Sequence, residues 1–428
     1  MKRFVIVGVG GRGTDSYAAT IIKEFAGRVE IVGIHDSNPK RMEACNRLLG
    51  ANLPMYTDFD EMLRKARPDA VVVTSKDSTH AQYVVKALDA GCMTYSEKPL
   101  CTSVDHIRAI RAAAARSTAK GYVTHNMRFV PDIEVIKQHL VNGAIGKILH
   151  ISFAETLDRY HGADYFRRWH RFMENSAGLL IHKSSHHFDI VNWFADSVPE
   201  TVTALGRQAF YGSNGPFHGN RCSDCPHTGT CEFYADVFKS ERMRIMYKEP
   251  EVVDGYFRDG CVFDPRIDIT DTISASIAYR NGVVANYSLV AYAAYESMRV
   301  AIEGTLGRIE IFHRYGTSWA VGNTQNDGKG SLANDGEDAG SYQKSHLYLP
   351  RERKRLEITA PPATGGHGGS DPKLREYLFG DSIIPDPLRQ KAPLEEGIQA
   401  VLVGLAANAS IQRQGAPIAV QGMCGGES

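Results

Sequence analysis

The stretch KRFVIVGVGGRG, residues 2–13, decides how the first part of this chain folds. Its apolar run FVIV is typical of a buried parallel strand. Gly8, Gly10 and Gly13 follow in G-x-G-x-x-G spacing, and a helix is predicted over residues 17–25. The first glycine permits the turn, the second lets a pyrophosphate approach the backbone, and the third lets helix and strand pack closely. The sequence therefore predicts a pyrophosphate at the N-terminus of this helix, rather than a plain glycine-rich turn.

The next strand carries a second sign of a dinucleotide site. Residues 29–34 (VEIVGI) read as a strand, and Asp36 follows where such folds place a carboxylate on the cofactor ribose. A carboxylate accepts hydrogen bonds from ribose hydroxyls and repels the 2′-phosphate of NADP. Asp36 therefore predicts NAD, and Arg41 close by keeps NADP as the less favoured cofactor.

Strands and helices alternate strictly as far as residue 125, which predicts a doubly wound parallel sheet. The further strands are expected at residues 69–74, 93–96 and 121–125, and the further helices at residues 58–65, 79–90 and 104–115. Ligands of such sheets bind beyond the carboxyl ends of the strands. Three strand ends, residues 74–77, 96–99 and 125–128, are therefore expected to converge on the cofactor.

The pattern changes after a helix near residues 131–142. Partly alternating segments predict an α+β domain with a large, mostly antiparallel open sheet, and they span residues 148–155, 201–208, 270–279, 283–289, 298–303 and 308–312. Asn281-Gly282 indicates a type I′ hairpin, and residues 321–343 are typical of a long surface loop. The domains are placed at residues 1–125 and 126–428, with the final helix, residues 393–412, as a candidate for packing back onto the first domain.

Composition excludes several classes of protein. The chain has 428 residues, 43% of them hydrophobic and 23% charged, as in soluble globular proteins. Lys plus Arg equals Asp plus Glu at 49 each, so no overall field favours nucleic acid or an anionic membrane. No stretch resembles a transmembrane span, and the N-terminal apolar run is broken by glycines, unlike a signal peptide. A cytoplasmic protein is expected, with its eight cysteines as thiols or metal ligands.

Lys98 is the first candidate for catalysis. It follows a strand and precedes Pro99, which restricts its backbone to extended conformations. Beside a nicotinamide, a lysine can hydrogen-bond a substrate hydroxyl and lower the cost of its deprotonation during hydride transfer. The alternative is a surface lysine before a turn.

The segment GLLIHKSSHHFD, residues 178–189, supplies further candidates. From residue 185 it reads as a helix that places His186 and Asp189 on one face, with His182 one turn earlier. Three histidines beside Lys183, just after a glycine turn, favour an active site over a set of core residues. His182, Lys183 and His186 are therefore predicted to be catalytic. A metal on His182 and His186 is disfavoured because no third ligand is evident.

Two other segments are candidates for substrate binding. Residues 161–171 (HGADYFRRWHR) combine aromatic faces with polar groups, as a sugar or polyol requires, unless they form a solvated basic loop. Residues 365–371 (GGHGGSD) present one histidine in a flexible loop that either closes over a pocket or is a linker. The predicted substrate contacts are Lys98, Arg128, His161, Tyr165, Trp169, Arg171, His187 and His367.

A cysteine cluster suggests a metal. Cys222, Cys225 and Cys231 occur in C-x₂-C-x₅-C spacing, and Cys261 is the best fourth ligand. Four thiolates would complete a tetrahedral structural zinc site. An iron–sulfur cluster and free thiols remain the alternatives.

Taken together, the chain resembles the Gfo/Idh/MocA oxidoreductase family, the group of glucose–fructose oxidoreductase and inositol dehydrogenase. The resemblance covers nearly the whole chain and rests on ordered motifs, namely Gly8-x-Gly10-x-x-Gly13 with Asp36, Thr79-His80, Glu97-Lys98-Pro99, Asn126-x-Arg128, Gly143-x-Ile145-Gly146, residues 178–189 and Glu303-Gly304-Thr305-x-Gly307. It implies a Rossmann domain, a larger-sheeted α/β domain that commonly forms dimers or tetramers, a bound NAD(P) and a carbohydrate or cyclitol substrate. The cofactor contacts expected from strand ends and resemblance are Gly8, Gly10, Gly11, Arg12, Gly13, Asp36, Ser75, His80, Glu97, Lys98 and Asn126.

The resemblance also assigns roles and reveals a departure. The family's lysine corresponds to Lys98 and its catalytic histidine to His186. The family usually has Asp four residues before that histidine, and here this position is His182. An imidazole in place of a carboxylate changes the charge and tuning of a proton relay. With the cysteine cluster, it indicates a divergent subfamily.

Three functions follow in order of preference. The first is an NAD-dependent oxidoreductase acting on a sugar, sugar derivative or cyclitol hydroxyl. The second is an NAD-dependent glycoside hydrolase that works by transient oxidation and elimination, with extra acid/base groups such as His182, Lys183 and His187. The third is a non-enzymatic NAD-sensing regulator, against which Lys98 and the histidines argue.

Overall fold

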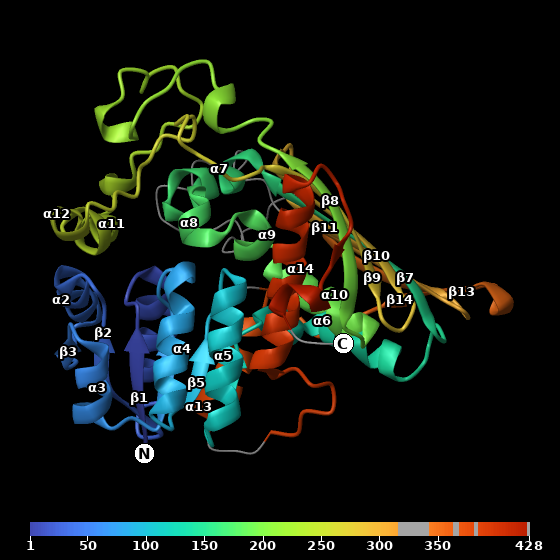
Figure 1. Cartoon of the computed structure of the whole chain (residues 1–428), viewed down its shortest axis with the longest axis horizontal. Helices are drawn as coiled ribbons and strands as arrows, with labels where there is room; N and C mark the ends of the chain where they lie inside the picture. Colours follow the sequence, from blue (N-terminus) through green and yellow to red (C-terminus); the bar gives the residue numbers. More distant parts are fainter. Residues whose placement is uncertain (316–341, 363–367, 381–383, 426–428) are drawn as a thin grey trace.

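Two sheets with their helices make up the molecule (Figure 1). The computed structural model describes residues 1–315, 342–362, 368–380 and 384–425. The first sheet has seven strands in the order β15-β6-β5-β4-β1-β2-β3, and the second has nine in the order β14-β13-β12-β11-β7-β10-β9-β8-β16. The predicted fold class, a Rossmann domain followed by a largely antiparallel α/β domain, is confirmed.

The first sheet is parallel except for its last strand, β15. Its strands are β1 (Lys2–Val7), β2 (Val29–His35), β3 (Met55–Tyr56), β4 (Ala70–Val73), β5 (Met93–Ser96), β6 (Gly121–Val123) and β15 (Ala392–Pro393). The central strand β4 is buried along its whole length, because helices cover both faces of the sheet. The helical segments are η1 (Arg12–Ala18), α1 (Ala19–Glu24), α2 (Pro39–Leu49), α3 (Phe59–Ala66), α4 (His80–Asp89) and α5 (Val104–Arg116). The helix predicted at residue 17 thus begins at Arg12, directly after the glycine turn.

The second sheet is antiparallel except where β10 runs parallel to β7. Its strands are β7 (Ile148–Asp158), β8 (Pro199–Arg207), β9 (Thr272–Tyr279), β10 (Val284–Ala293), β11 (Ser297–Gly304), β12 (Arg308–Arg314), β13 (Tyr342–Leu349), β14 (Lys354–Ile358) and β16 (Ile418–Ala419). Helices α6 (Pro131–Val141), α10 (Ser185–Ala195) and α14 (Leu394–Gln412) lie on the side of this sheet toward the Rossmann domain (Figure 1). Side chains at alternate positions of β7 are buried, as expected for a sheet with one covered face.

Residues from the end of the chain join the two sheets. Helix α13 (Ser370–Phe379) packs on the Rossmann core, where the Phe379 ring lies 5.4 Å from the Phe4 ring. Strand β15 pairs with β6, so α14 starts against the first domain. The rest of α14 packs on α10 and β8. The final helix therefore bridges the two domains.

Two local expectations need correction. The hairpin between β9 and β10 is present, but Gly282 alone has a positive φ there, +87°, and the loop holds residues 280–282. A type I′ turn needs two positive φ values, so this is a three-residue loop closed by glycine. A long loop was expected at residues 321–343. Residues 321–341 of it lie outside the described residues, and residues 342 and 343 belong to β13.

One segment of the second domain reaches across to the first. After β8 the chain passes through η5 (Gly212–Asn214), η6 (Cys222–Asp224), η7 (Val237–Lys239), α11 (Glu241–Met243), η8 (Arg244–Lys248) and α12 (Glu251–Asp254). In Figure 1 this segment arches from the second sheet to the edge of the Rossmann domain, so that α11 and α12 lie beside α2. Among the described residues, no helix is both long and apolar enough to cross a membrane.

Candidate active site

A cavity of about 1190 Å³ lies between the two domains, at the carboxyl ends of the parallel strands. Its floor is the glycine turn after β1 together with the ends of β2, β4 and β5. Its other walls come from α7 (Arg159–Arg167), η4 (Trp169–Arg171), α8 (Met173–Ser176), α9 (Leu179–His182), the start of α10 and residues 242–258. The predicted convergence of strand ends is therefore found, and the cavity is large enough for a cofactor and a small substrate.

The glycine turn has the shape that a pyrophosphate requires. A Cβ on Gly8, whose φ is +83°, would lie 2.5 Å from the backbone of Ser75, and one on Gly13 would lie 2.1 Å from the carbonyl oxygen of Gly8. At Gly10 the nearest other atom would be the Tyr247 hydroxyl at 3.9 Å, so this backbone is open to the cavity. Gly8, Gly10 and Gly11 line the cavity, whereas Gly13 is used in packing. These residues fit a bound dinucleotide.

Asp36 lies at the adenosine end of the same cavity. Its carboxylate accepts the backbone N–H of Val9 at 3.1 Å and that of Asn38 at 2.9 Å, and it pairs with Arg41 at 3.3 Å. Arg41 also pairs with Asp254 at 2.8 Å. Because two carboxylates hold the Arg41 guanidinium, it is poorly placed for a 2′-phosphate, in agreement with the preference for NAD.

Glu97 and His80 fix the loop that carries Lys98. Glu97 accepts hydrogen bonds from Arg12 Nε at 2.7 Å and from the Tyr17 hydroxyl at 2.6 Å. His80 contacts the carbonyl oxygens of Pro99 and Ser75 at 2.7 and 3.0 Å. The predicted cofactor residues Arg12, Ser75, His80, Glu97, Lys98 and Asn126 all line the cavity, with Asn126 donating to Asp371.

Lys98 reaches across the cavity to the second domain. Its Nζ donates to the carbonyl oxygen of His182 at 2.8 Å, and the Lys98–Pro99 peptide bond is cis. Burial lowers the pKa of Lys98 below its ordinary value of 10.5. A buried ammonium next to the expected nicotinamide position is suited to hydrogen-bonding a substrate oxygen that acquires negative charge.

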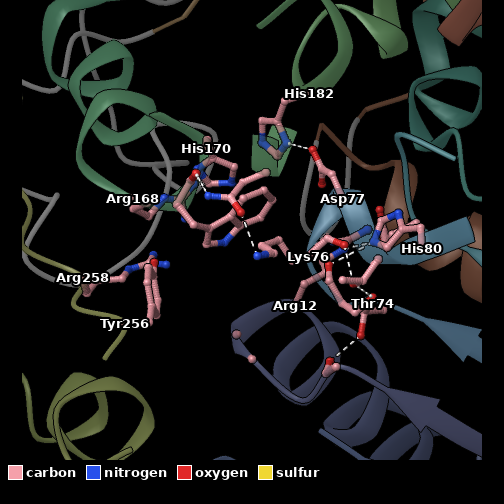
Figure 2. A pocket seen from close by; sticks show the side chains of 18 of the residues that line it. Arg12, Thr74, Lys76, Asp77, His80, Arg168, His170, His182, Tyr256 and Arg258 are labelled. Carbon is pink, nitrogen blue, oxygen red and sulfur yellow. Dashed lines mark hydrogen bonds and ion pairs between the residues drawn. The ribbon is translucent and has the colours of Figure 1, made fainter. Parts of the chain in front are cut away.

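His182 forms a pair that the sequence did not reveal. Its Nδ1 lies 2.6 Å from Oδ2 of Asp77, a Rossmann-domain residue directly after β4 (Figure 2). Burial lowers the pKa of His182 well below 6.5 and raises the pKa of Asp77 well above 3.8, so the ring is neutral and one short hydrogen bond joins the two groups. The resemblance leads us to expect a carboxylate at position 182, and a carboxyl group from the other domain lies against the histidine found there. The only sequence sign of Asp77 was its place at a strand end.

His186 and Lys183 line the cavity beside His182. Nδ1 of His186 is buried and has no hydrogen-bond partner in the described part of the chain. Burial lowers the pKa of His186 well below 6.5, so this imidazole is also neutral at pH 7. Lys183 pairs with Glu155 at 3.3 Å, while burial raises the pKa of that carboxyl to about 7.

The aromatic wall is built on α7 and η4. Asp158 caps α7 by accepting the N–H groups of residues 160 and 161, at 2.8 and 2.9 Å, which brings His161 to the cavity. Burial opposes a charge on His161, but its 2.7 Å pair with Glu296 outweighs this and raises the pKa to about 10. Tyr165, Trp169 and Arg171 also line the cavity, and Arg171 pairs with Asp264 at 3.5 Å.

Three predicted substrate contacts need a different account. Arg128 is buried in ion pairs with Asp189, at 2.6 Å, and with Glu396, so it holds α10 and α14 rather than facing the cavity. His187 points into the core, where it contacts the Tyr287 hydroxyl at 2.9 Å. His367 lies outside the described residues.

The predicted metal site is not supported. The four cysteines do line one small cavity of about 10 Å³, apart from the large one. Among the described residues, however, no group of three or more His, Cys, Asp or Glu is arranged to hold an ion. Arg167 donates to Cys222 Sγ at 3.0 Å, and burial raises the pKa values of Cys231 and Cys261.

Comparison with known proteins agrees with this architecture. Residues 2–125 match the family model described as "Oxidoreductase family, NAD-binding Rossmann fold", and residues 137–420 match its companion, "Oxidoreductase family, C-terminal alpha/beta domain". The chain is 33% identical over 424 residues to the putative oxidoreductase YteT of Bacillus subtilis, with 94% of each chain covered.

More distant relatives have established names. An inositol 2-dehydrogenase of Rhizobium meliloti is 25% identical over 174 residues, which are 41% of this chain and 50% of that protein. A solved levoglucosan dehydrogenase, in complex with NADH and levoglucosan, superposes with a TM-score of 0.65 at 16% identity, covering 98% of this chain and 99% of the other. At that identity the superposition shows the shared fold alone.

Proposed function

The chain belongs to the Gfo/Idh/MocA oxidoreductase family, and from this premise we propose that it oxidises a hydroxyl of a sugar, sugar derivative or cyclitol, with NAD as the hydride acceptor. Relatives named as inositol 2-dehydrogenase and D-apiose dehydrogenase support this class of substrate. The observation that carries the proposal is the shared cavity, because Lys98, His182 and His186 line the same space as the glycine turn.

The protein's residues divide the work of the reaction. NAD, when bound on the glycine turn, supplies the hydride acceptor. Lys98 stabilises the substrate oxygen as negative charge develops on it, and the neutral His186 accepts the hydroxyl proton. The aromatic wall of Tyr165 and Trp169 stacks against the C–H face of the sugar and excludes water from the reacting centre.

His182 and Asp77 form a second acid/base pair in this proposal. The Asp77 carboxylate orients the imidazole and stabilises the imidazolium that forms when Nε2 takes a proton, as a carboxylate does in a catalytic triad. The Lys98–His182 hydrogen bond keeps this pair next to the lysine. His186 and His182 thus offer two separate proton acceptors on one cavity.

The direct test is turnover of a panel of sugars, sugar acids and cyclitols with NAD, following NADH absorbance and identifying products by mass spectrometry. We expect one chemical class to give both a keto product and NADH in equal amounts. Absence of any oxidised product across the panel, from a protein that binds NAD, would refute the proposed reaction.

The second candidate is a redox-neutral glycoside hydrolase with a recycled NAD. It is favoured by the extra pair of Asp77 and His182, because transient oxidation, elimination, water addition and reduction require more than one acid/base group. Cleavage of a glycoside without net NADH formation, from protein purified with bound NAD, would distinguish it from the dehydrogenase.

We also propose that the boundary between the two domains lies near residue 125. We propose further that the protein forms a homodimer or homotetramer through the uncovered face of the nine-stranded sheet. Leu205 on β8 and Val284 on β10 are 63% and 45% exposed, and both alternate with buried residues of their strands, so they lie on this uncovered face. Light scattering of the purified protein tests the oligomer, and Leu205→Glu is expected to weaken it.

A further inference from the structure

The segment of residues 241–258 belongs to the second domain, yet it packs against the Rossmann domain. Met243, Met246 and Tyr247 are buried in a small apolar cluster that also contacts Leu48 of α2. In Figure 1, α11 and α12 lie beside α2 at the outer edge of the Rossmann domain. A part of the second domain therefore covers the dinucleotide end of the large cavity.

Polar contacts fix this segment to the Rossmann domain on both sides of the dinucleotide end of the cavity. On the pyrophosphate side, the Tyr247 hydroxyl accepts the Gly11 N–H at 3.0 Å, and Arg242 pairs with Asp15. On the adenosine side, Asn38 donates to the carbonyl oxygen of Pro250 at 2.9 Å, and Arg41 pairs with Asp254 at 2.8 Å. The segment therefore spans the width of the cofactor site.

The Tyr247 hydroxyl has one unused hydrogen bond. It accepts the Gly11 N–H, while its own proton has no acceptor among the described residues. The oxygen lies at the open backbone of Gly10, where a pyrophosphate is expected. The Arg258 guanidinium lies 4.6 Å from the ring centre and has no carboxylate within ion-pair distance in the described part of the chain.

Electrostatics favour a negative partner at this hydroxyl. Burial opposes ionisation of the phenol, but the charge of Arg258, the Gly11 N–H and the charges of Arg168 and Arg242 together lower the pKa of Tyr247 below 10.0. A more acidic phenol is a stronger hydrogen-bond donor, and an anionic acceptor strengthens the bond further. Tyr247 and Arg258 together thus present a donor and a positive charge toward the glycine turn (Figure 2 shows Arg258 on the wall opposite His182).

We propose that residues 241–258 are the second half of the dinucleotide site: Tyr247 donates its hydroxyl proton to a pyrophosphate oxygen, and the segment retains NAD by closing the way out. This inference rests on the proposed NAD-dependent function. It assigns a cofactor contact to the second domain, and it predicts that release of the cofactor is slow enough to limit turnover.

The test measures NADH release directly, apart from activity. The purified full-length protein is loaded with NADH, excess NAD is added, and the loss of bound-NADH fluorescence gives the release rate. Tyr247→Phe removes the hydroxyl and keeps the ring, and it is expected to raise the release rate about tenfold to a hundredfold, the range for one hydrogen bond to a charged group. Tyr234→Phe is the matched control, because Tyr234 lies shortly before this segment in the chain and lines the small cysteine cavity instead of the large cavity.

A second variant separates the tyrosine from the segment as a whole. Asp254→Asn breaks the pair with Arg41 but leaves Tyr247 intact, and it is expected to raise the release rate severalfold. Equal release from Tyr247→Phe and the unmodified protein, with the two proteins equally stable to heat, overturns the pyrophosphate contact. A faster release in Tyr247→Phe with no change in Asp254→Asn overturns the retaining role of the segment. If the unmodified protein binds neither NADH nor NAD, the proposed function itself fails.

Discussion

Replacing Glu296 by glutamine is expected to remove a large, pH-dependent part of the stability of this protein. Glu296 is fully buried and holds His161 at 2.7 Å. Burial acts in the opposite direction, but Glu296, with a smaller contribution from Tyr165, raises the pKa of His161 from 6.5 to about 10. At about 1.36 kcal/mol for each tenfold change in proton affinity, the stabilisation amounts to about 5 kcal/mol at low pH and about 4 kcal/mol at pH 7.

The direction in which the unfolding free energy changes with pH follows from the raised pKa of His161 in the folded state. Folding favours the protonated ring, so the stabilisation is complete below pH 6.5 and is lost as the pH rises through about 10. The unmodified protein should lose roughly 2 kcal/mol from this source between pH 8 and pH 10. Glu155, whose pKa burial raises to about 7, titrates mainly below this window. Glu296→Gln keeps the size of the side chain but not its charge, so its unfolding free energy should lack this slope.

The assay is urea unfolding at pH 7, 8, 9 and 10, followed by circular dichroism. Glu376→Gln is the control, because Glu376 and its partner Arg28 are both about 40% exposed and such a pair contributes less than about 1 kcal/mol. Parallel stability curves for Glu296→Gln and the unmodified protein across this range would refute the assignment of a buried imidazolium to His161. The variant should also bind substrate differently, because His161 lines the cavity.

Four further substitutions test the site. Lys98→Met and His186→Ala should each lower kcat by about 10² to 10⁴ without weakening NADH binding in a fluorescence titration; unchanged turnover would remove their catalytic roles. Asp77→Asn should lower kcat by about 10¹ to 10² with little change in KM and should alter the acid limb of the pH–rate profile, whereas an unshifted profile would limit Asp77 to a structural role. Asp36→Ala should relax the preference for NAD over NADP in paired binding measurements, and an unaltered preference would contradict its ribose contact.

The first domain could be predicted from sequence because its signals are local. The glycine spacing, the apolar run before it and the regular alternation of strands and helices each constrain a short stretch of chain. The limits of some elements shifted, as where the first helix begins at Arg12, and α2 and the two-residue strand β3 were not predicted. In the second domain, β13 and β14 were missed. They pair with each other at the edge of the sheet, and β14 is exposed at four of its five positions, so it has no alternating apolar pattern.

The residues predicted for the site also fall into two groups, those with a local signal that placed them in the cavity and those that packing placed elsewhere. Lys98, His182 and His186 could be found because each stands in a compact motif beside a glycine or proline. Arg128 and His187 occur in equally suggestive motifs, but packing turned them toward Asp189 and Tyr287. No periodicity in the sequence indicates on which side of a helix such a polar residue finds a buried partner.

The contacts that sequence reasoning could not supply are those in which each domain contributes one half. Asp77 of the Rossmann domain orients His182 of the second domain, Lys98 donates to the backbone of His182, and Gly11 donates to Tyr247. Each pair exists only while the two domains are docked, so cofactor binding and proton transfer depend on the same interface. A substitution that loosens this interface should therefore impair both together, even when it changes no residue that touches the substrate. In the mechanism that we propose, Asp77 of the docked Rossmann domain supplies the carboxyl group that the resemblance leads us to expect at position 182.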